Sequence, residues 1–350
     1  MKENLRVPIN KGNYSMDTKI RERMFDKNRG HDYKKRYKFY RKMWSKLPQN
    51  YKVSEYPLEV GLELSSVCNL RCPFCYTITD KFQSNIKNKF MKKELAKNII
   101  DEVAGKTYSI RLSYRGEPTL YPYLVNIIKY AKAKGINEVS FLTNGSKLEP
   151  HYFEKLLLAG VDWITVSFDG IKKEYEKNRY PLKFNDTLKK LKEIKIIKEK
   201  YNKVKPVIKV QTVWPAIKNN PTEYYKTLSK YTDLIAFNPL IDFENEEYNS
   251  EKYLEDFSCP MLYQRIFVHS DGYVVPCCGS PNENLIIGDA NKESIYDIWH
   301  SEKLNYIRNK HKKKTEYKKI DVCKTCFLAR KTREEKHTID GRVVIVKKYI

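Results

Sequence analysis

The chain has 350 residues, enough to bury a full hydrophobic core and to form two domains. Its eight cysteines are too few for a disulfide scaffold, and it has no apolar run of the roughly 18 residues that span a bilayer. The charged N-terminus lacks the apolar stretch of a secretory leader, so clustered cysteines indicate a reducing compartment and metal binding. The sequence therefore predicts a cytoplasmic protein.

The net charge is +24, and residues 1–54 supply 16 basic against 5 acidic side chains. Four aromatic residues recur in this segment at helical spacing, with basic residues between them: Tyr33, Tyr37, Tyr40 and Trp44. Such segments can bind nucleic acid. The same spacing is typical of an amphipathic helix whose aromatic side packs on a neighbouring domain, which is the interpretation we favour. An anionic substrate is also compatible with the positive field of the chain.

From residue 57 onward, predicted strands alternate with predicted helices. The strands are expected over 58–65, 108–113, 138–142, 163–168, 205–213 and 234–238. The helices are expected over 91–104, 122–134, 151–159, 185–200 and 222–230. Six such units predict an α/β fold with a parallel sheet, and six rather than eight suggest an open, partial (β/α)6 barrel. In barrels of this kind the active site lies at the C-terminal ends of the strands.

The composition divides the chain into three expected regions. These are a basic, aromatic-rich helical extension (1–56), the partial barrel (57–245) and a small cysteine-rich C-terminal domain with a tail (250–350).

Three cysteines follow the first predicted strand in the run Glu-Leu-Ser-Ser-Val-Cys-Asn-Leu-Arg-Cys-Pro-Phe-Cys-Tyr. A structural zinc site uses four ligands, and the nearest histidines lie far off along the chain. A [4Fe–4S] cluster held by three thiolates, here Cys68, Cys72 and Cys75, keeps one iron open for a small molecule. The run resembles the signature of the radical S-adenosylmethionine (SAM) superfamily, in which the open iron chelates the methionyl group of SAM. The resemblance places Phe74 beside SAM.

Two further motifs extend this resemblance. Tyr-Arg-Gly-Glu-Pro-Thr follows the second strand and is similar to the family's Gly-Gly-Glu-Pro motif, although Arg115 replaces the first glycine. The resemblance implies that Gly116 and Glu117 bind the SAM amino group. Thr-Asn-Gly follows the third strand, where Asn144 is expected near the SAM ribose; an ordinary turn is the alternative.

Ser-Phe-Asp-Gly ends the fourth strand and is followed by an arginine. It resembles a block of family members that carry a C-terminal auxiliary-cluster domain. The resemblance implies that Ser167 and Asp169 contact the SAM ribose or the substrate. Arg179 is a candidate partner for the SAM carboxylate, and a surface ion pair is its alternative. Gln211 on the fifth strand points to the same end of the barrel.

A second candidate ligand set consists of Cys259, Cys277, Cys323 and Cys326. Their spacing resembles the SPASM/twitch module, shortened so that four ligands complete a single [4Fe–4S] cluster; spacing alone also allows a zinc ribbon. Cys278 is left over. It is either a buried small hydrophobe or a catalytic hydrogen-atom donor to a substrate radical.

The resemblance implies a radical SAM enzyme with SAM and two [4Fe–4S] clusters, one SAM-binding and one auxiliary, reduced by a donor such as flavodoxin or ferredoxin. Its 5′-deoxyadenosyl radical would abstract hydrogen. The favoured substrate is a sugar or other small molecule that is oxidised or epimerised. The alternative is a maturase that crosslinks, oxidises or epimerises peptide side chains. A non-catalytic nucleic-acid-binding metalloprotein ranks last, because it leaves Glu117 and the open iron without a use.

Overall fold

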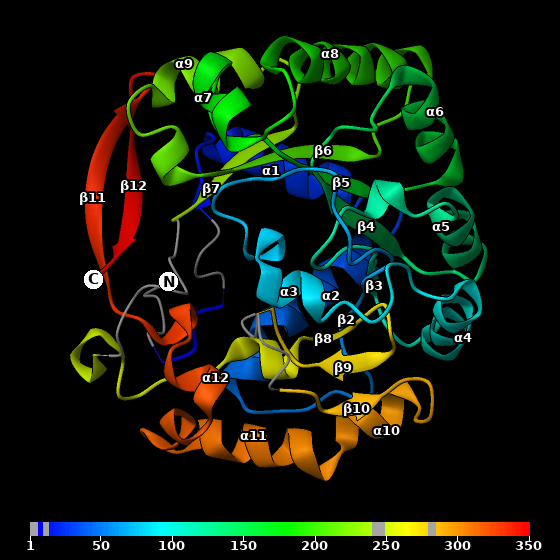
Figure 1. Ribbon diagram of the computed structural model, residues 1–350, viewed down its shortest axis with the longest axis vertical. Coiled ribbons are helices and arrows are strands. Elements are labelled where there is room, and N and C mark those ends of the chain that lie inside the picture. The colour runs from blue at the N-terminus through cyan, green and yellow to red at the C-terminus, as the bar shows by residue number, and fades with distance from the viewer. Residues whose placement is uncertain (1–5, 10–13, 240–248, 279–284) are drawn as a thin grey trace.

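The computed structural model describes residues 6–9, 14–239, 249–278 and 285–350. Its centre is a curved ten-stranded sheet in the order β1-β7-β6-β5-β4-β3-β2-β8-β9-β10, which forms most of a ring (Figure 1). Six consecutive strands are parallel: β2 (Glu59–Leu62), β3 (Ser109–Arg111), β4 (Glu138–Thr143), β5 (Trp163–Ser167), β6 (Val207–Val213) and β7 (Leu234–Asn238). The predicted parallel six-stranded partial barrel is therefore confirmed.

Helices cover the outside of the ring (Figure 1). They are α4 (Lys93–Val103), α5 (Leu124–Ala133), α6 (Pro150–Ala159), α7 (Lys172–Asn178), α8 (Phe184–Lys200) and α9 (Pro221–Leu228). These helices pack on the sheet through one apolar side. In α4, for example, the apolar side chains from Leu95 to Val103 recur at helical spacing and are all buried. Helix α6 ends at Gly160, whose φ of 88° suits glycine. In the described ranges, no helix has the length and apolarity needed to cross a membrane.

The N-terminal segment packs on the barrel through its aromatic side chains. Strand β1 (Tyr14–Ser15) pairs antiparallel with β7, and α1 (Lys19–Arg29) and α2 (Lys34–Gln49) follow. From α2, Tyr37, Tyr40 and Trp44 are buried together with Tyr108, which immediately precedes β3. The Tyr40 and Tyr108 rings stack with centroids 4.3 Å apart. The packing-helix interpretation is confirmed for these three aromatic residues.

The C-terminal region continues the central sheet. Strand β8 (Arg265–Val268) runs parallel to β2, and β9 (Tyr273–Val275) and β10 (Gly288–Asp289) add antiparallel strands. Helices α10 (Ile295–His300) and α11 (Glu302–Lys312) lie at the bottom of Figure 1, and α12 (Asp321–Lys324) lies to the left of these strands. The expected domain boundary falls largely on residues 240–248, outside the described residues. The direct β2–β8 pairing fixes the C-terminal region against the barrel.

A terminal hairpin, β11 (Thr332–Ile339) with β12 (Arg342–Tyr349), runs along the open side of the ring to α9 (Figure 1). At its tip, Nη1 of Arg342 donates to the Tyr225 hydroxyl at 3.2 Å. Trp214, after β6, contacts His337 with ring centroids 4.8 Å apart. The hairpin therefore joins the C-terminal region to the far edge of the barrel.

Candidate active site

The first three cysteines lie on the loop between β2 and α3 (Asp80–Ser84), and α3 lies in front of the centre of the ring in Figure 1. Burial raises the pKa of Cys72 to about 11, against the lowering effect of Arg179, and the neighbouring thiols Cys75 and Cys68 raise it further. This mutual influence means that the three thiols lie near enough to interact electrostatically. They lie at the C-terminal end of β2, where the barrel fold predicts the active site.

Two of the predicted site residues direct N–H groups at these sulfur atoms. Nδ2 of Asn144 lies 3.6 Å from Sγ of Cys68, and Nη1 of Arg179 lies 3.7 Å from Sγ of Cys72. The backbone N–H of Leu70 also points at Sγ of Cys68, at 3.5 Å. Donors around sulfur favour thiolates, which are the form that binds iron. The donor set therefore fits a three-cysteine iron–sulfur cluster.

Gly116 lets two loops meet at the site. A Cβ at this position would lie 2.4 Å from the carbonyl oxygen of Ser65 and 2.6 Å from that of Val67, which glycine alone avoids. The next backbone N–H, that of Glu117, donates to the Val67 oxygen at 2.8 Å. The loop after β3 is thereby held against the chain that leads into Cys68.

Arg115, which departs from the family motif, turns away from this contact. Its guanidinium forms a two-pronged ion pair with Glu63 at 2.5 and 2.7 Å. Glu63 also accepts a hydrogen bond from the backbone N–H of Ser270, which follows β8, at 3.1 Å. Arg115 therefore helps to fix the C-terminal region beside the mouth of the barrel.

Glu117 is buried, and its carboxylate accepts four hydrogen bonds from the protein. The donors are the backbone N–H and hydroxyl of Thr119 (3.0 and 2.5 Å), the Thr143 hydroxyl (2.6 Å) and the backbone N–H of Asn144 (2.7 Å). Burial raises its pKa, and these donors act against the rise. A carboxylate has about four acceptor positions. Glu117 thus ties the loop after β3 to the Thr-Asn-Gly turn after β4.

Asp169 and Arg179 form a buried ion pair beside Cys72. Asp169 is fixed in turn by the backbone N–H of Val213 at 2.9 Å and the hydroxyl of Thr212 at 3.1 Å. The Arg179 side chain is 13% exposed, so the surface-pair alternative is wrong. Ser167 is buried at the end of β5, directly opposite Gln211 of β6. Phe74 is half-buried within the cysteine loop.

The four cysteines of the second set also converge. Burial raises the pKa of Cys323, and the thiols of Cys277, Cys326 and Cys259 raise it further. Burial likewise raises the pKa of Cys259 to about 12, with Cys326 contributing. The four thiols therefore lie near enough to influence one another electrostatically, although no three of them, among the described residues, are grouped closely enough to hold a single metal ion. This donor set fits a fully ligated iron–sulfur cluster.

His311 was missed by sequence reasoning, because no ligand spacing points to it. It is fully buried on α11, and its Nδ1 accepts the backbone N–H of Cys259 at 3.2 Å. The proton of the neutral ring must then be on Nε2, which lies 3.3 Å from Sγ of Cys323. Burial lowers the pKa of His311 to about 4, so the ring is neutral near pH 7.

A cavity of about 310 Å³ lies inside the barrel, between the strands, α2 and the C-terminal region, and none of the seven proposed ligand cysteines is among its described lining residues. From the barrel it is lined by residues at the ends of strands, including Leu142 and Gln211. From the C-terminal region it is lined by Met261, Cys278 and Leu328, which lie within two residues of Cys259, Cys277 and Cys326. Cys278 is exposed to this cavity, while surrounding protein raises the pKa of its thiol by desolvation, so both of its interpretations stay open.

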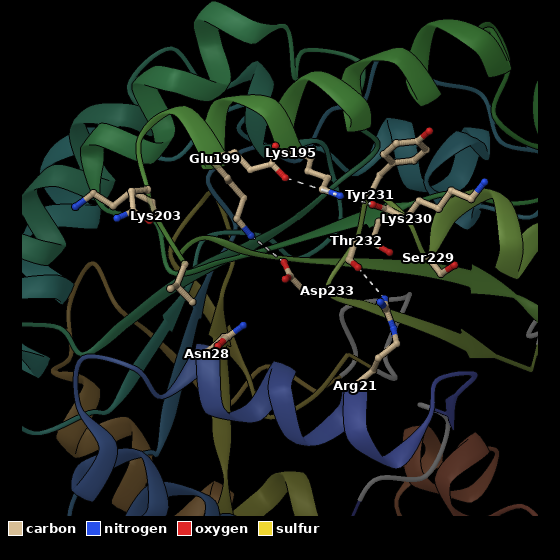
Figure 2. Close-up of a pocket in the computed structure, with 13 residues that line it drawn as sticks. Arg21, Asn28, Lys195, Glu199, Lys203, Ser229, Lys230, Tyr231, Thr232 and Asp233 are labelled. Atoms are coloured by element: carbon tan, nitrogen blue, oxygen red, sulfur yellow. Dashed lines mark hydrogen bonds and ion pairs between the residues drawn. The ribbon is translucent and has the colours of Figure 1, made fainter.

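A second cavity, of about 530 Å³, lies between α1, α8 and the loop before β7 (Figure 2). Its basic side chains contact acceptors of the chain: Lys198 pairs with Asp233 at 2.9 Å, and Arg21 donates to the Thr232 carbonyl at 2.7 Å. Of the described site residues that the sequence predicts, this cavity includes none. It lies at the N-terminal ends of β6 and β7, opposite the cysteine loop.

A partial barrel with a three-cysteine loop at its mouth and a four-cysteine module at its side defines an iron–sulfur enzyme that generates radicals. The radical SAM superfamily matches residues 62–238, and an iron–sulfur cluster-binding domain, SPASM, matches residues 259–327. The chain belongs to the radical SAM superfamily and carries a C-terminal SPASM domain. It is an enzyme that uses SAM, a SAM-binding [4Fe–4S] cluster and an auxiliary iron–sulfur cluster.

Two curated relatives match parts of the chain. An S-adenosylmethionine-dependent nucleotide dehydratase of Flammeovirga pacifica is 33% identical over 119 residues, 34% of this chain and 40% of that protein. An AdoMet-dependent heme synthase of Methanosarcina barkeri is 34% identical over 122 residues, 35% of this chain and 34% of that protein. The match therefore spans well under half of either relative.

Several solved structures share the fold. BtrN in complex with AdoMet and 2-DOIA aligns with a TM-score of 0.53 at 20% identity, covering 79% of this chain and 94% of that one. Streptococcus suis SuiB bound to its precursor peptide SuiA aligns with a TM-score of 0.53 at 17% identity, covering 77% and 70%. Native anSMEcpe with bound AdoMet gives 0.55 at 17% identity, covering 73% and 84%.

Proposed function

We propose that the protein oxidises or epimerises a sugar or another small molecule by hydrogen-atom abstraction. The observation that supports this proposal is the cavity inside the barrel, whose lining includes Leu142, two residues before Asn144, and residues that flank the second cysteine set. In this proposal, a substrate in the cavity would meet the deoxyadenosyl radical at the C-terminal ends of the strands. The auxiliary cluster, beside the cavity, would accept an electron.

The proposal gives each predicted residue a role. Cys68, Cys72 and Cys75 hold the SAM-binding cluster, and Cys259, Cys277, Cys323 and Cys326 hold the auxiliary cluster. The SAM contacts come from Phe74, Gly116, Glu117, Asn144, Ser167, Asp169 and Arg179. Together, the reduced cluster and SAM supply a 5′-deoxyadenosyl radical, while the chain orients the substrate and excludes water.

Oxidation of the substrate removes one hydrogen atom, one electron and one proton. The substrate C–H bond breaks, its hydrogen atom goes to the deoxyadenosyl carbon, and a carbon radical remains on the substrate. To become an oxidised product, this radical must lose one electron and one proton. The auxiliary cluster supplies an electron acceptor beside the cavity, and its potential is set by the hydrogen bonds to its sulfur ligands.

The size of the cavity favours a small molecule over a peptide. Small-molecule sites have volumes of about 300–1,000 Å³, and this cavity, at about 310 Å³, lies at the lower limit. A peptide maturase remains the alternative, since SuiB, a fold neighbour, is bound to its precursor peptide. The nucleic-acid alternative loses its main support, because Tyr37, Tyr40 and Trp44 are buried and do not offer faces for base stacking.

Epimerisation is the redox-neutral variant of the same proposal. In that case the substrate radical is quenched by a hydrogen atom from the opposite face, and no electron leaves the substrate. Cys278 is the candidate donor, because its thiol is exposed and lines the cavity.

The test is a panel of sugars, sugar phosphates and nucleotides incubated anaerobically with reduced enzyme and SAM. A deuterated substrate should transfer deuterium to 5′-deoxyadenosine. The Cys323→Ala/Cys326→Ala variant should keep this transfer and lose the oxidised product, whereas Cys278→Ala should block turnover only if the enzyme is an epimerase. Full oxidative turnover without the auxiliary cluster would contradict the electron-transfer role. Turnover of peptides and of no small molecule would favour the maturase.

The proposal includes a cytoplasmic location, since the clusters need a reducing compartment. It also includes a low-potential electron donor such as flavodoxin or ferredoxin, because SAM cleavage consumes an electron.

A further inference from the structure

The outward side of α2 carries many cations and no carboxylate. Over Lys34–Gln49 the helix has seven Lys or Arg residues and no Asp or Glu. Tyr37, Tyr40 and Trp44 are buried against the barrel, so helical spacing turns the opposite side of α2 toward solvent. That side presents a row of four exposed lysines, three or four residues apart: Lys35, Lys38, Lys42 and Lys46. At 1.5 Å per residue, this lysine row is roughly 17 Å long.

The chain does not neutralise the lysine row. Among the described residues, no carboxylate pairs with any of its four side chains. Other lysines of the barrel differ, since Lys132, Lys190 and Lys198 each pair with a carboxylate. Like charges on one side of a helix repel one another, and a surface of opposite charge relieves that repulsion when it binds. The lysine row therefore favours a negatively charged partner.

An exposed aromatic ring lies within the lysine row. The Phe39 side chain is 64% exposed, between Lys38 and Lys42. An apolar centre with a polar rim is the usual anatomy of a protein–protein interface, and electron-transfer partners form the smallest of these. A single ring gives a nucleic acid only one position for base stacking. The surface therefore favours an acidic protein over a nucleic acid.

Helix α2 also lies beside the second cysteine set. The carbonyl oxygen of Trp44 accepts a hydrogen bond of 2.7 Å from Nε2 of Gln264, which is buried. Gln264 follows the short helix η5 (Pro260–Tyr263), which contacts α2 and begins directly after Cys259. At about 2 Å per residue, Gln264 lies roughly 10 Å from Cys259. One helix and one short turn thus separate a protein docked on α2 from the proposed auxiliary cluster.

The proposed function needs an exit for one electron. In substrate oxidation, one electron leaves the substrate radical in each turnover, and the site that receives it must be emptied before the next turnover. Transfer to an oxidised carrier protein empties that site. The auxiliary cluster is then oxidised by one electron and the carrier is reduced by one electron, with no bond formed or broken.

We infer that the outward side of α2, formed by Lys35, Lys38, Phe39, Lys42 and Lys46, docks an acidic electron-carrier protein that takes electrons from the auxiliary cluster. This inference rests on the proposed function, in which the auxiliary cluster accepts an electron from the substrate. It specifies the partner as a one-electron carrier with a negatively charged patch beside its redox cofactor.

Binding of an oxidised flavodoxin of net negative charge to the reconstituted full-length enzyme tests this inference. Fluorescence anisotropy of the labelled flavodoxin gives the affinity at low and at physiological ionic strength. Lys38→Glu/Lys42→Glu should weaken binding at low salt at least about tenfold, since it reverses two charges at the centre of the lysine row. The same variant should flatten the salt dependence, because screening acts on the attraction that it removes. Phe39→Ser should weaken binding and keep the salt dependence of the wild type.

The matched control is Lys192→Glu/Lys203→Glu, which reverses two exposed lysine charges on and after α8. It changes the net charge equally, so its affinity should stay near that of the wild type. Uncoupled SAM cleavage with dithionite at the wild-type rate shows that both double variants fold. The inference is overturned if flavodoxin does not bind the wild type, or if both double variants weaken binding equally. A single-stranded oligonucleotide that binds through the lysine row, where flavodoxin does not, also overturns it.

Stopped-flow mixing separates this inference from the proposed function. The Cys68→Ala/Cys72→Ala/Cys75→Ala variant should hold only the auxiliary cluster; once reduced and freed of dithionite, it is mixed with oxidised flavodoxin. Adding Lys38→Glu/Lys42→Glu should slow its reoxidation about tenfold. No substrate is present, so an unchanged rate defeats the docking surface alone. A wild type that oxidises no small molecule defeats the proposed function and leaves this rate as it is.

Discussion

Nε2 of His311 lies 3.3 Å from Sγ of Cys323, and Nδ1 of the same ring accepts the backbone N–H of Cys259. The ring therefore bridges two proposed ligands of the auxiliary cluster, and its contact with the backbone N–H of Cys259 fixes its tautomer. An N–H directed at a ligand sulfur stabilises the more negative, reduced state of a cluster, so it raises the reduction potential.

Replacing His311 with Phe should lower the reduction potential of the auxiliary cluster while leaving the iron content near that of the wild type. Potentiometric titration followed by electron paramagnetic resonance measures the shift. His300→Phe is the control, since the His300 ring contacts the carbonyl of Glu55 and not a cysteine. An unchanged potential in His311→Phe would show that the ring only fills space.

Glu117→Gln should weaken SAM binding about tenfold or more, because an amide NH₂ cannot accept the hydrogen bonds that a carboxylate oxygen accepts, each worth ~1.5–3 kcal/mol. Cluster content should be unchanged, since Glu117 is not a proposed ligand. Anaerobic titration with SAM measures the affinity. The exposed Glu149→Gln serves as the control. Wild-type affinity in Glu117→Gln would remove Glu117 from the SAM site.

Arg29→Ala should destabilise the protein by about 3–5 kcal/mol, because it leaves Glu138 buried without its partner. Thermal unfolding measures the loss, and the exposed Lys35→Ala should have little effect. The double variant Arg29→Met/Glu138→Leu should recover most of the stability, since an apolar pair replaces the charged one. A stable Arg29→Ala protein would show that α1 contributes little to holding the barrel.

The cysteine motifs and the parallel strands could be predicted from the sequence because their signals are local. Three thiols within eight residues predict a cluster site from one short segment, and an apolar run before a Gly-Glu-Pro turn predicts a strand and its loop in the same way. Placing each motif at the same end of parallel strands predicted that Asn144 and Arg179 lie near the cysteine loop, whereas their contacts with Cys68 and Cys72 came from the structure.

Other features depend on pairing between distant segments, which no local pattern encodes. The parallel pairing of β8 with β2 joins residues about 200 positions apart. Similarly, Arg115 replaces a glycine of the family motif, and no local pattern predicts its ion pair with Glu63.

The most direct test of the central claim is the amount of 5′-deoxyadenosine formed from SAM by the anaerobically reconstituted, dithionite-reduced protein. The wild type should form it, and Cys323→Ala/Cys326→Ala should still form it. The Cys68→Ala/Cys72→Ala/Cys75→Ala variant should form none, because it lacks the ligands of the SAM-binding cluster. Formation of 5′-deoxyadenosine by the triple variant, or none by the wild type, would contradict the account.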